Sequence, residues 1–207
     1  MSYPAADWRE TRREAARAAI VEAAWAAVED EGLAGLSLRD LAKRAGTTTP
    51  TIYKYFASKN DIYDAMFGQA AAEFEAFLAA PYPSEQPRAA LEEGVRRFFA
   101  FCTSDIPRYQ LLFQRTIPGF EPSPESFAAA VRALAGTRQV LARNGVTGTR
   151  QVDLWTALTT GLVDQQISND PGGRRWTRLA EDSVTMFLDH ARKTSSSSSS
   201  RRRRQRP

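Results

Sequence analysis

The sequence predicts a nearly all-α protein, and two observations carry this prediction. Apolar residues recur at helical spacing from one end of the chain to the other, and no segment shows sustained alternation of β-branched and polar residues. Clusters of Pro, Gly and Ser/Thr divide the chain into pieces of helical length. With 207 residues, 43% of them hydrophobic, the chain is long enough for one large domain or two smaller ones with a true core.

The first two helices are predicted from their caps. A first helix is expected over about 9–31, since Ala, Ile and Val recur on one side and Gly32 supplies a C-terminal stop. A second helix is expected to start at Ser37 and to end at Gly46. There the Ser37 hydroxyl is predicted to accept a hydrogen bond from an orphan amide while Asp40 reaches back, as in a capping box.

The third helix is predicted over 50–56, because Pro50 suits a first helical position and Thr49 can cap it. The capping pattern recurs at Ser58 and Asp61, which predicts a fourth helix ending near Pro81. Breaks at later Pro and Gly residues predict further helices over 86–104, 106–115, 124–144, 149–169 and 174–193.

Two short helices joined by a Gly-containing turn describe a helix-turn-helix, whose second helix enters the major groove of DNA while the first braces it. The local charge agrees. Residues 33–60 hold five basic residues against Asp40 alone, a local +4. The formal charge of the whole chain is also +4, but its last seven residues hold five arginines, so the rest has 23 basic and 24 acidic groups. The positive charge that supports DNA binding is therefore the local +4 over residues 33–60, not the charge of the whole chain.

Hydroxyls, a Lys and a Pro that point away from the small apolar core are expected to touch base edges or thymine methyls. These residues are Thr49, Pro50, Thr51 and Lys54. Phosphate oxygens are expected to be bound by Thr48, Tyr53, Tyr55 and Lys59. The candidate interface also includes Ser37, Arg39 and Lys43. Taken alone, the helical pair is also compatible with ordinary packing, half-buried tyrosines and a solvated basic face.

The full sequence of this segment decides between these interpretations. Residues 37–46 read SLRDLAKRAG and residues 51–62 read TIYKYFASKNDI. Together they closely resemble the signature of the TetR family of bacterial transcriptional regulators, a match of about 26 residues in the first quarter of the chain. Thr47 departs from the pattern, because the family usually has an apolar Val there, and a hydroxyl weakens the packing of the turn slightly.

The resemblance implies a three-helix DNA-binding domain over 1–57 and a larger helical domain over 58–194 that binds a ligand and dimerises. The second half more weakly resembles a subgroup of the family with a Trp-x4-His-Gly motif. Trp155 and Gly161 fit that motif, but Thr160 replaces the His, so no role of that His transfers to this chain. The Ser/Arg-rich residues 195–207 have nothing apolar to bury and are expected to be disordered.

Specificity from a two-turn helix requires two copies about 34–36 Å apart, which predicts a dimer on a near-palindromic operator in double-stranded DNA. The family resemblance implies a homodimer through the last two helices. Candidate stripes on these helices are Trp176, Leu179, Ala180, Val184, Phe187, Leu188 and Ala191, with Trp155, Leu158, Gly161 and Leu162. A purely intrachain core is the alternative interpretation of the same stripes.

Aromatic residues are dense in the middle of the second half. As a group they suit a mostly apolar pocket for a small-molecule effector, although any one of them is more often plain core. The residues predicted to line the pocket are Phe98, Cys102, Tyr109, Phe113, Phe127, Trp155 and Thr159. A coupling of about 1–3 kcal/mol between this pocket and the DNA-binding domains would suffice to release DNA, as in a repressor.

Other function classes are disfavoured. The single cysteine, Cys102, excludes an intrachain disulfide, suits a reducing cytoplasm and lies in an apolar run where an inert thiol is expected. The lone His190 excludes a multi-histidine metal site, and no catalytic motif is present, so we expect no enzyme, metal or cofactor. No apolar run approaches the roughly 20 residues of a membrane span. The alternative function is an all-α ligand- or partner-binding protein without operator-specific DNA binding.

Overall fold

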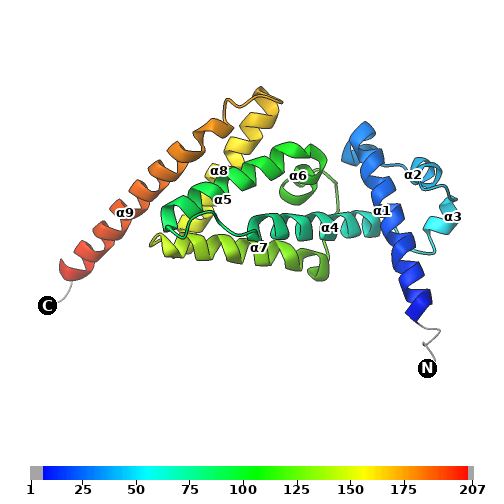
Figure 1. Ribbon diagram of the computed structural model, residues 1–207, viewed down its shortest axis with the longest axis horizontal. Helices are drawn as coiled ribbons and strands as arrows, with labels where there is room; N and C mark the ends of the chain where they lie inside the picture. The colour runs from blue at the N-terminus through cyan, green and yellow to red at the C-terminus, as the bar shows by residue number, and fades with distance from the viewer. Residues whose placement is uncertain (1–6, 205–207) are drawn as a thin grey trace. The chain divides into compact units, whose positions relative to one another are not determined.

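The computed structural model describes residues 7–204, with side chains placed over residues 8–194. Over this range the chain consists of helices joined by turns and short loops and contains no strand, which confirms the all-α prediction for that part (Figure 1). Within the same range, no helix has both the length and the apolar character of a membrane span. The helices are α1 (Asp7–Gly35), α2 (Leu38–Arg44), α3 (Thr49–Ile52), α4 (Lys59–Ala79), α5 (Pro87–Ser104), α6 (Ile106–Phe113), α7 (Pro124–Arg143), α8 (Thr149–Asn169), the 3-10 turn η1 (Thr177–Leu179) and α9 (Ala180–Arg204).

The first compact unit joins the described part of residues 1–73 to residues 107–130. Its core contains α1, α2, α3 and the first turns of α4, together with Leu111 of α6 and Ala129 of α7. The predicted domain boundary at residue 57 falls inside this unit, because Ile62 and Met66 of α4 are fully buried in that same core. This compact unit therefore extends past residue 57, and the division into functional domains stays a prediction.

A carboxylate on α4 holds the start of α7 in the first unit. Asp64 accepts hydrogen bonds from the backbone N–H of Ser123 (2.6 Å), from the Ser123 hydroxyl (2.9 Å) and from the Ser126 hydroxyl (2.8 Å). One turn further along α4, Gly68 has no side chain, and a Cβ there would lie 3.1 Å from the Ser126 hydroxyl oxygen. Bonds to a charged acceptor are stronger than neutral ones, so the two helices are firmly joined.

A second joint connects α6 to α1 and α4. The Arg108 guanidinium lies 4.4 Å from the ring centroid of Trp25 and pairs with Glu73 at 3.0 Å. The Trp25 indole N–H donates to Gln69 at 2.9 Å, so the buried ring is held on both sides. A cation over a desolvated indole face is a favourable arrangement. These contacts explain why α6 belongs to the same unit as α1.

The second unit comprises residues 74–106 and the part from residue 131 onward that the structure describes. Here α5, α8 and α9 pack together through apolar residues at helical spacing, with Trp155 against Phe187 at 4.8 Å between ring centroids. Polar contacts also join α5 to α9, since Arg96 pairs with Glu181 at 3.3 Å. Residues every three or four positions along these helices therefore form an ordinary helical core.

Two helix ends differ from prediction. The helical run of α1 continues to Gly35, although Gly32 breaks its regular geometry with φ 71° and ψ 166°. The backbone of α9 is helical through Arg204, past the predicted end at residue 193.

The start of the last helix also differs, because α9 begins at Ala180 and not near residue 174. The backbone N–H groups of Trp176 (2.8 Å) and Thr177 (3.2 Å) donate to the side chain of Gln166, a buried residue of α8. This hydrogen bonding holds the segment before Ala180 in a turn and a short 3-10 helix rather than in α9.

The stripe predicted to face a second copy lies mostly inside its own unit. Val184, Phe187 and Leu188 are at most 3% exposed, and Ala180 and Ala191 are also buried. On α8, Trp155 is likewise buried against Phe187. For these residues the intrachain interpretation is correct, because α5 and α8 cover them. The apolar residues that remain exposed on α8 and α9 include Leu154 and Met186.

Candidate nucleic-acid interface

The turn between α2 and α3 has the geometry that the sequence predicts. Gly46 adopts φ 60°, a left-handed conformation that favours glycine, and Thr47 N–H donates to the Ala42 carbonyl at 2.9 Å. Leu41 and Ile52 are fully buried in the core shared with α1. Buried apolar residues on both helices thus fix the angle at which α3 leaves the turn.

The predicted capping box at Ser37 is wrong. Ser37 is the residue before α2, but its side chain makes no capping hydrogen bond there. Asp40 instead pairs with Arg44 one turn later, at 2.6 Å. A second carboxylate, that of Asp30 on α1, lies 2.9 Å from the same guanidinium. The salt bridge satisfies Asp40, so Asp40 does not reach back to the helix start.

Arg44 belongs to this structural cluster and not to the DNA-facing set. The Arg44 guanidinium donates to the carboxylates of Asp40 and Asp30, and these hydrogen bonds raise its pKa. It also donates to the Ala26 carbonyl at 3.3 Å. The local +4 seen in the sequence is thus partly neutralised by α1. The basic side chains left for an external anion around the turn are Arg39, Lys43, Lys54 and Lys59.

Helix α3 is shorter than predicted and is capped one residue earlier. Thr48 precedes the helix, whose first two residues are Thr49 and Pro50. Regular α geometry ends at Ile52, after which turns lead to Phe56. The missing N–H of Pro50 is harmless in the first turn, where no partner exists inside the helix. The shift of one residue moves Thr49 from the cap into the helix.

All eleven residues predicted to touch DNA lie at the surface. Tyr53 is 52% exposed, which is unusual for a large aromatic residue, and Lys54 beside it is exposed as well. Thr49, Thr51, Tyr55 and Lys59 are half-buried. The Thr48 and Thr51 hydroxyls lie 3.0 Å apart and order the start of α3. The exposed members are Ser37, Arg39, Lys43, Thr48, Pro50, Tyr53 and Lys54.

The start of α4 follows the predicted capping box. The Ser58 hydroxyl accepts from the Asp61 N–H at 3.2 Å, and the Ser58 N–H donates to the Asp61 carboxylate at 3.2 Å. This reciprocal cap confirms the prediction. It fixes Lys59 at the first position of α4, with its ammonium 5.5 Å from the ring centroid of Tyr63.

The helix pair described above is also the part of the chain that matches a known protein family. Residues 20–66 match the family described as "Bacterial regulatory proteins, tetR family". The HTH-type transcriptional regulator Rv1816 of Mycobacterium tuberculosis is 24% identical over 166 residues, which cover 78% of this chain and 68% of that protein. Residues 20–66, which contain the helix-turn-helix, therefore belong to the TetR family. TetR family proteins are DNA-binding transcriptional regulators, and this chain is one of them.

Solved structures share the fold of this TetR family chain. A protein of unknown function from Rhodococcus sp. RHA1 has a TM-score of 0.73 at 18% identity, covering 85% of this chain and 95% of that one. The TetR family regulator PfmR from Thermus thermophilus has a TM-score of 0.62 at 19% identity, covering 82% and 97%. The multidrug binding protein EbrR, complexed with imidazole, has a TM-score of 0.59 at 22% identity, covering 83% and 93%.

The residues predicted to line a ligand pocket are divided between the two units. Tyr109, Phe113 and Phe127 lie in the first unit, and the other four in the second. The rings of Tyr109 and Phe113 are 5.4 Å apart, whereas Phe127 stacks on Phe67 at 6.0 Å. Within the first unit, Tyr109 is fully buried while Phe127 is 46% exposed.

The four pocket candidates of the second unit behave largely as core residues. Cys102 is fully buried, and burial raises the pKa of its thiol, an effect to which the nearby Asp164 adds. The Thr159 hydroxyl donates to the Trp155 carbonyl at 3.0 Å, within α8. Phe98 packs edge-on against Phe74, with ring centroids 6.1 Å apart.

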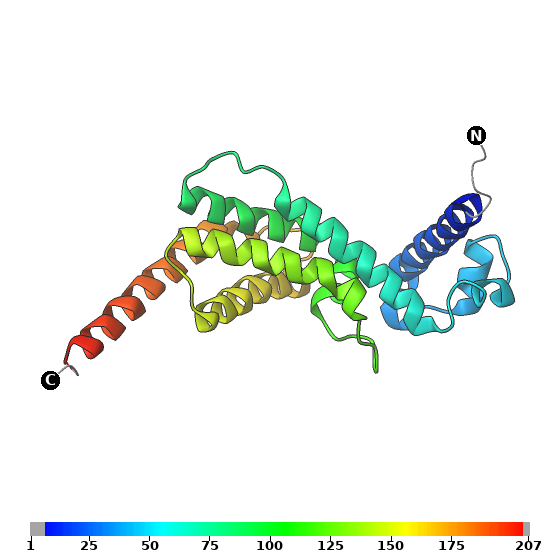
Figure 2. The same ribbon diagram turned by 90° about the horizontal axis from the view of Figure 1, so that it is seen from below.

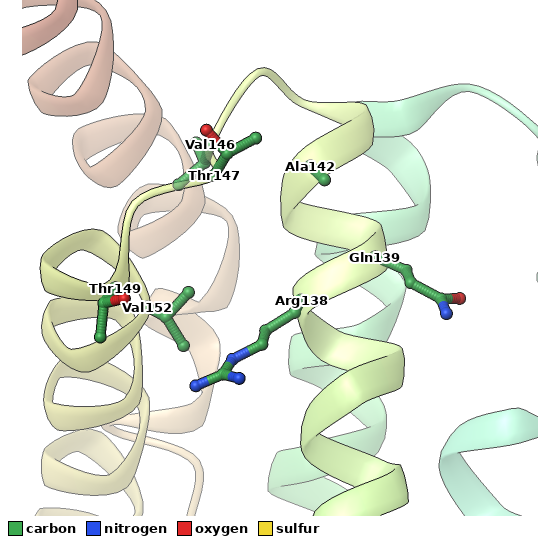
Figure 3. Close-up of a pocket in the computed structure, with 7 residues that line it drawn as sticks. All are labelled: Arg138, Gln139, Ala142, Val146, Thr147, Thr149 and Val152. Carbon is green, nitrogen blue, oxygen red and sulfur yellow. The ribbon is translucent and has the colours of Figure 1, made fainter.

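A hollow of about 290 Å³ lies elsewhere in the second unit, between the end of α7 and the start of α8. Figure 3 shows the Arg138 side chain extending from α7 toward α8. The lining residues are Arg138, Gln139, Ala142, Val146, Thr147, Thr149 and Val152, none of which was predicted. The sequence signal here was only the Gly145–Gly148 break, which predicts a turn but not a cavity.

Proposed function

We propose that this TetR family protein is a repressor that binds a near-palindromic operator as a homodimer and is released by a small, mostly apolar molecule. One observation carries the proposal. A helix-turn-helix with a buried apolar side presents exposed Tyr53 and Lys54 next to a left-handed glycine turn. An exposed aromatic beside an exposed lysine has little role in packing but suits a phosphate backbone and base edges.

In the proposed complex, α3 enters the major groove. Thr49, Pro50, Thr51 and Lys54 face base edges, while Thr48, Tyr53, Tyr55 and Lys59 bind phosphates along with Ser37, Arg39 and Lys43. Residues 1–57 then form the DNA-reading domain and residues 58–194 the ligand-sensing and dimerisation domain. Operators lie in bacterial DNA, so the proposed location is the cytoplasm. No catalytic activity is proposed, because the family consists of regulators.

The proposed dimer uses the outward face of α8 with the exposed side of α9. On α8, Leu154, Ala157 and Gly161 are exposed and follow one another at helical spacing. On α9, Met186 is 59% exposed. A Cβ built on Gly161 meets no atom within 4 Å, so the surface beside it is open to a closely packed helix. This set replaces the buried residues first predicted for the interface.

The effector is proposed to bind at the aromatic residues of the first unit that the sequence identified. Two of these, Phe113 (37%) and Phe127 (46%), keep exposed ring surface that a ligand can cover. The structural relative EbrR is described as a multidrug binding protein, which supports an apolar effector for this chain. A binding site of this kind needs many apolar walls and few polar groups.

DNA binding is tested by selecting sequences from a random duplex library with the full chain, followed by titration of the selected duplex at several salt concentrations. We expect enrichment of a near-palindrome. Lys54→Ala is expected to lower operator affinity by about 1–3 kcal/mol and to relax preference at one position, because it removes a base contact. Tyr53→Phe is expected to weaken binding to all sequences about equally.

Arg138→Ala is the control, because it removes one exposed charge from the second unit without touching the proposed interface. If neither Lys54→Ala nor Tyr53→Phe changes affinity more than this control, the assignment of α3 is wrong. No enrichment at any salt concentration would favour the alternative, an all-α ligand- or partner-binding protein without operator-specific DNA binding.

A further inference from the structure

The first turns of α1 carry a group of arginines that the helix-turn-helix does not include. Figures 1 and 2 show these turns (dark blue) continuing beyond α3. Arg9, Arg12 and Arg13 are exposed, and none of them forms an ion pair with a described residue. By contrast, Arg44 and Arg108 are each paired with a carboxylate in the same unit. We call Arg9, Arg12 and Arg13 together the α1 arginine flank.

Charge is sorted by side along these turns. At about 100° per residue, Arg9, Arg12, Arg13 and Arg17 fall within about 140° of the helix circumference, with no acidic residue among them. Glu10 and Glu14 fall on the adjoining side. This separation creates one basic side and one acidic side on these turns.

Arg17 shows which way the basic side faces. Its guanidinium donates to the Tyr55 carbonyl and lies 4.2 Å from the ring centroid of Phe56, at the end of the helix-turn-helix. On the adjoining side, Trp25 lies within about 20° of the direction of Glu14, and its indole N–H donates to Gln69 of α4. Arg9 and Arg13, which lie within about 80° of Arg17 on the helix circumference, therefore lie toward this end of the helix-turn-helix.

We infer that the α1 arginine flank is a second DNA-binding surface, which holds phosphates of the duplex next to the segment that α3 reads. The inference rests on the proposed function, because α3 must first place the duplex. Arginine is well suited to phosphate, since its planar guanidinium donates two parallel hydrogen bonds to phosphate oxygens. The segment from Arg17 to Arg9 is about 12 Å long, the length of three to four nucleotides of one strand.

The test is the salt dependence of binding. Each phosphate contact contributes about 0.9 to the slope of log K against log salt, so Arg13→Gln is expected to reduce the slope by about 2 in a dimer with two symmetric contacts. At 0.15 M salt, each lost contact corresponds to about a fivefold loss of affinity. The ratio of operator to random-sequence affinity is expected to stay constant, since phosphates carry no sequence information.

A duplex series gives a second readout. With base pairs added beyond the selected palindrome, the triple variant Arg9→Gln, Arg12→Gln, Arg13→Gln is expected to bind less tightly than wild type. On a duplex cut at the palindrome's ends, the two proteins are expected to bind nearly alike, because the flanking phosphates are gone. Arg138→Gln in the second unit is the charge-matched control, and melting temperatures check that all variants fold.

The outcomes separate the two proposals. If wild type selects an operator but Arg13→Gln has the slope of Arg138→Gln, or duplex length makes no difference, the flank is only a solvated face and this inference is wrong. If wild type shows no sequence preference at all, the proposed function itself fails. Equal losses for Arg13→Gln and Arg138→Gln would indicate a general charge effect and would likewise overturn the flank as a contact surface.

Discussion

Substitution of Gly161 tests the proposed dimer at one position. Gly161 lies in the interior of α8, is exposed, and would have no atom within 4 Å of an added Cβ. In an isolated protomer, Gly161→Ala is therefore expected to stabilise the helix by roughly 0.8–1.0 kcal/mol, the usual difference in helix propensity. In a dimer whose helices approach closely at this glycine, the added carbon has to displace the partner helix. Whether Gly161→Ala stabilises or destabilises the protein therefore shows whether a partner helix packs against this position.

Gly161→Glu is expected to weaken the dimer more strongly than Gly161→Ala. A two-fold interface places the same patch of both subunits together, so the variant introduces two carboxylates into one interface. Like charges brought together across an interface cost several kcal/mol. At about 3 kcal/mol, the Kd of the dimer rises more than a hundredfold. Sedimentation velocity over a wide range of protein concentration measures this shift directly.

Gly136 supplies the matched control. It lies in the interior of α7, is exposed, and likewise would have no atom within 4 Å of a Cβ. Gly136→Ala is expected to raise stability by the same amount, and Gly136→Glu is expected to leave the dimer intact. If Gly161→Glu dimerises as tightly as Gly136→Glu, the outward face of α8 is not the interface. A wild-type chain that stays monomeric at every concentration would contradict the dimer itself.

Two further predictions concern single buried groups. Cys102, the only cysteine, is fully buried and burial raises the pKa of its thiol, so a maleimide is expected to label the native protein much more slowly than the urea-unfolded protein; equal labelling rates would contradict its burial. The buried Tyr63 hydroxyl donates to the Leu33 carbonyl, and burial raises the pKa of Tyr63 to about 12. Its stabilising effect is therefore complete below pH 10 and is lost as pH rises toward 12. Tyr63→Phe is expected to lower the free energy of unfolding by about 1 kcal/mol at pH 8, and urea titrations should show that difference shrinking at pH 11; a constant difference would refute the argument.

Local signals in the sequence predicted local features well. The Ser58 capping box and the turn at Gly46 are both present. At Ser37 the same pattern failed, because Arg44 competes for the Asp40 carboxylate. Whether a cap forms depends on which other hydrogen-bonding or charged partners the fold brings near the capping side chains. A pattern of four consecutive residues does not contain that information.

Contacts between distant segments were not predictable in this way. The hydrogen bonds of Asp64 to Ser123 and Ser126 join positions about 60 residues apart, and nothing in the periodicity of either helix marks them. Through these contacts the start of α7 belongs to the same compact unit as the first part of α4. For the same reason, apolar stripes on α8 and α9 did not reveal which side another helix of the chain already covers.

The position of Arg108 over Trp25 has an optical consequence. Indole fluorescence responds to a nearby cation and to the hydrogen bond of its N–H group, and Trp25 has both, from Arg108 at 4.4 Å and Gln69 at 2.9 Å. Any displacement of α6 against α1 changes the first contact and leaves the second in place. Once the other three tryptophans are replaced, Trp25 is therefore an intrinsic probe at the joint between α1 and α6, which can follow a titration with candidate effectors without any added dye.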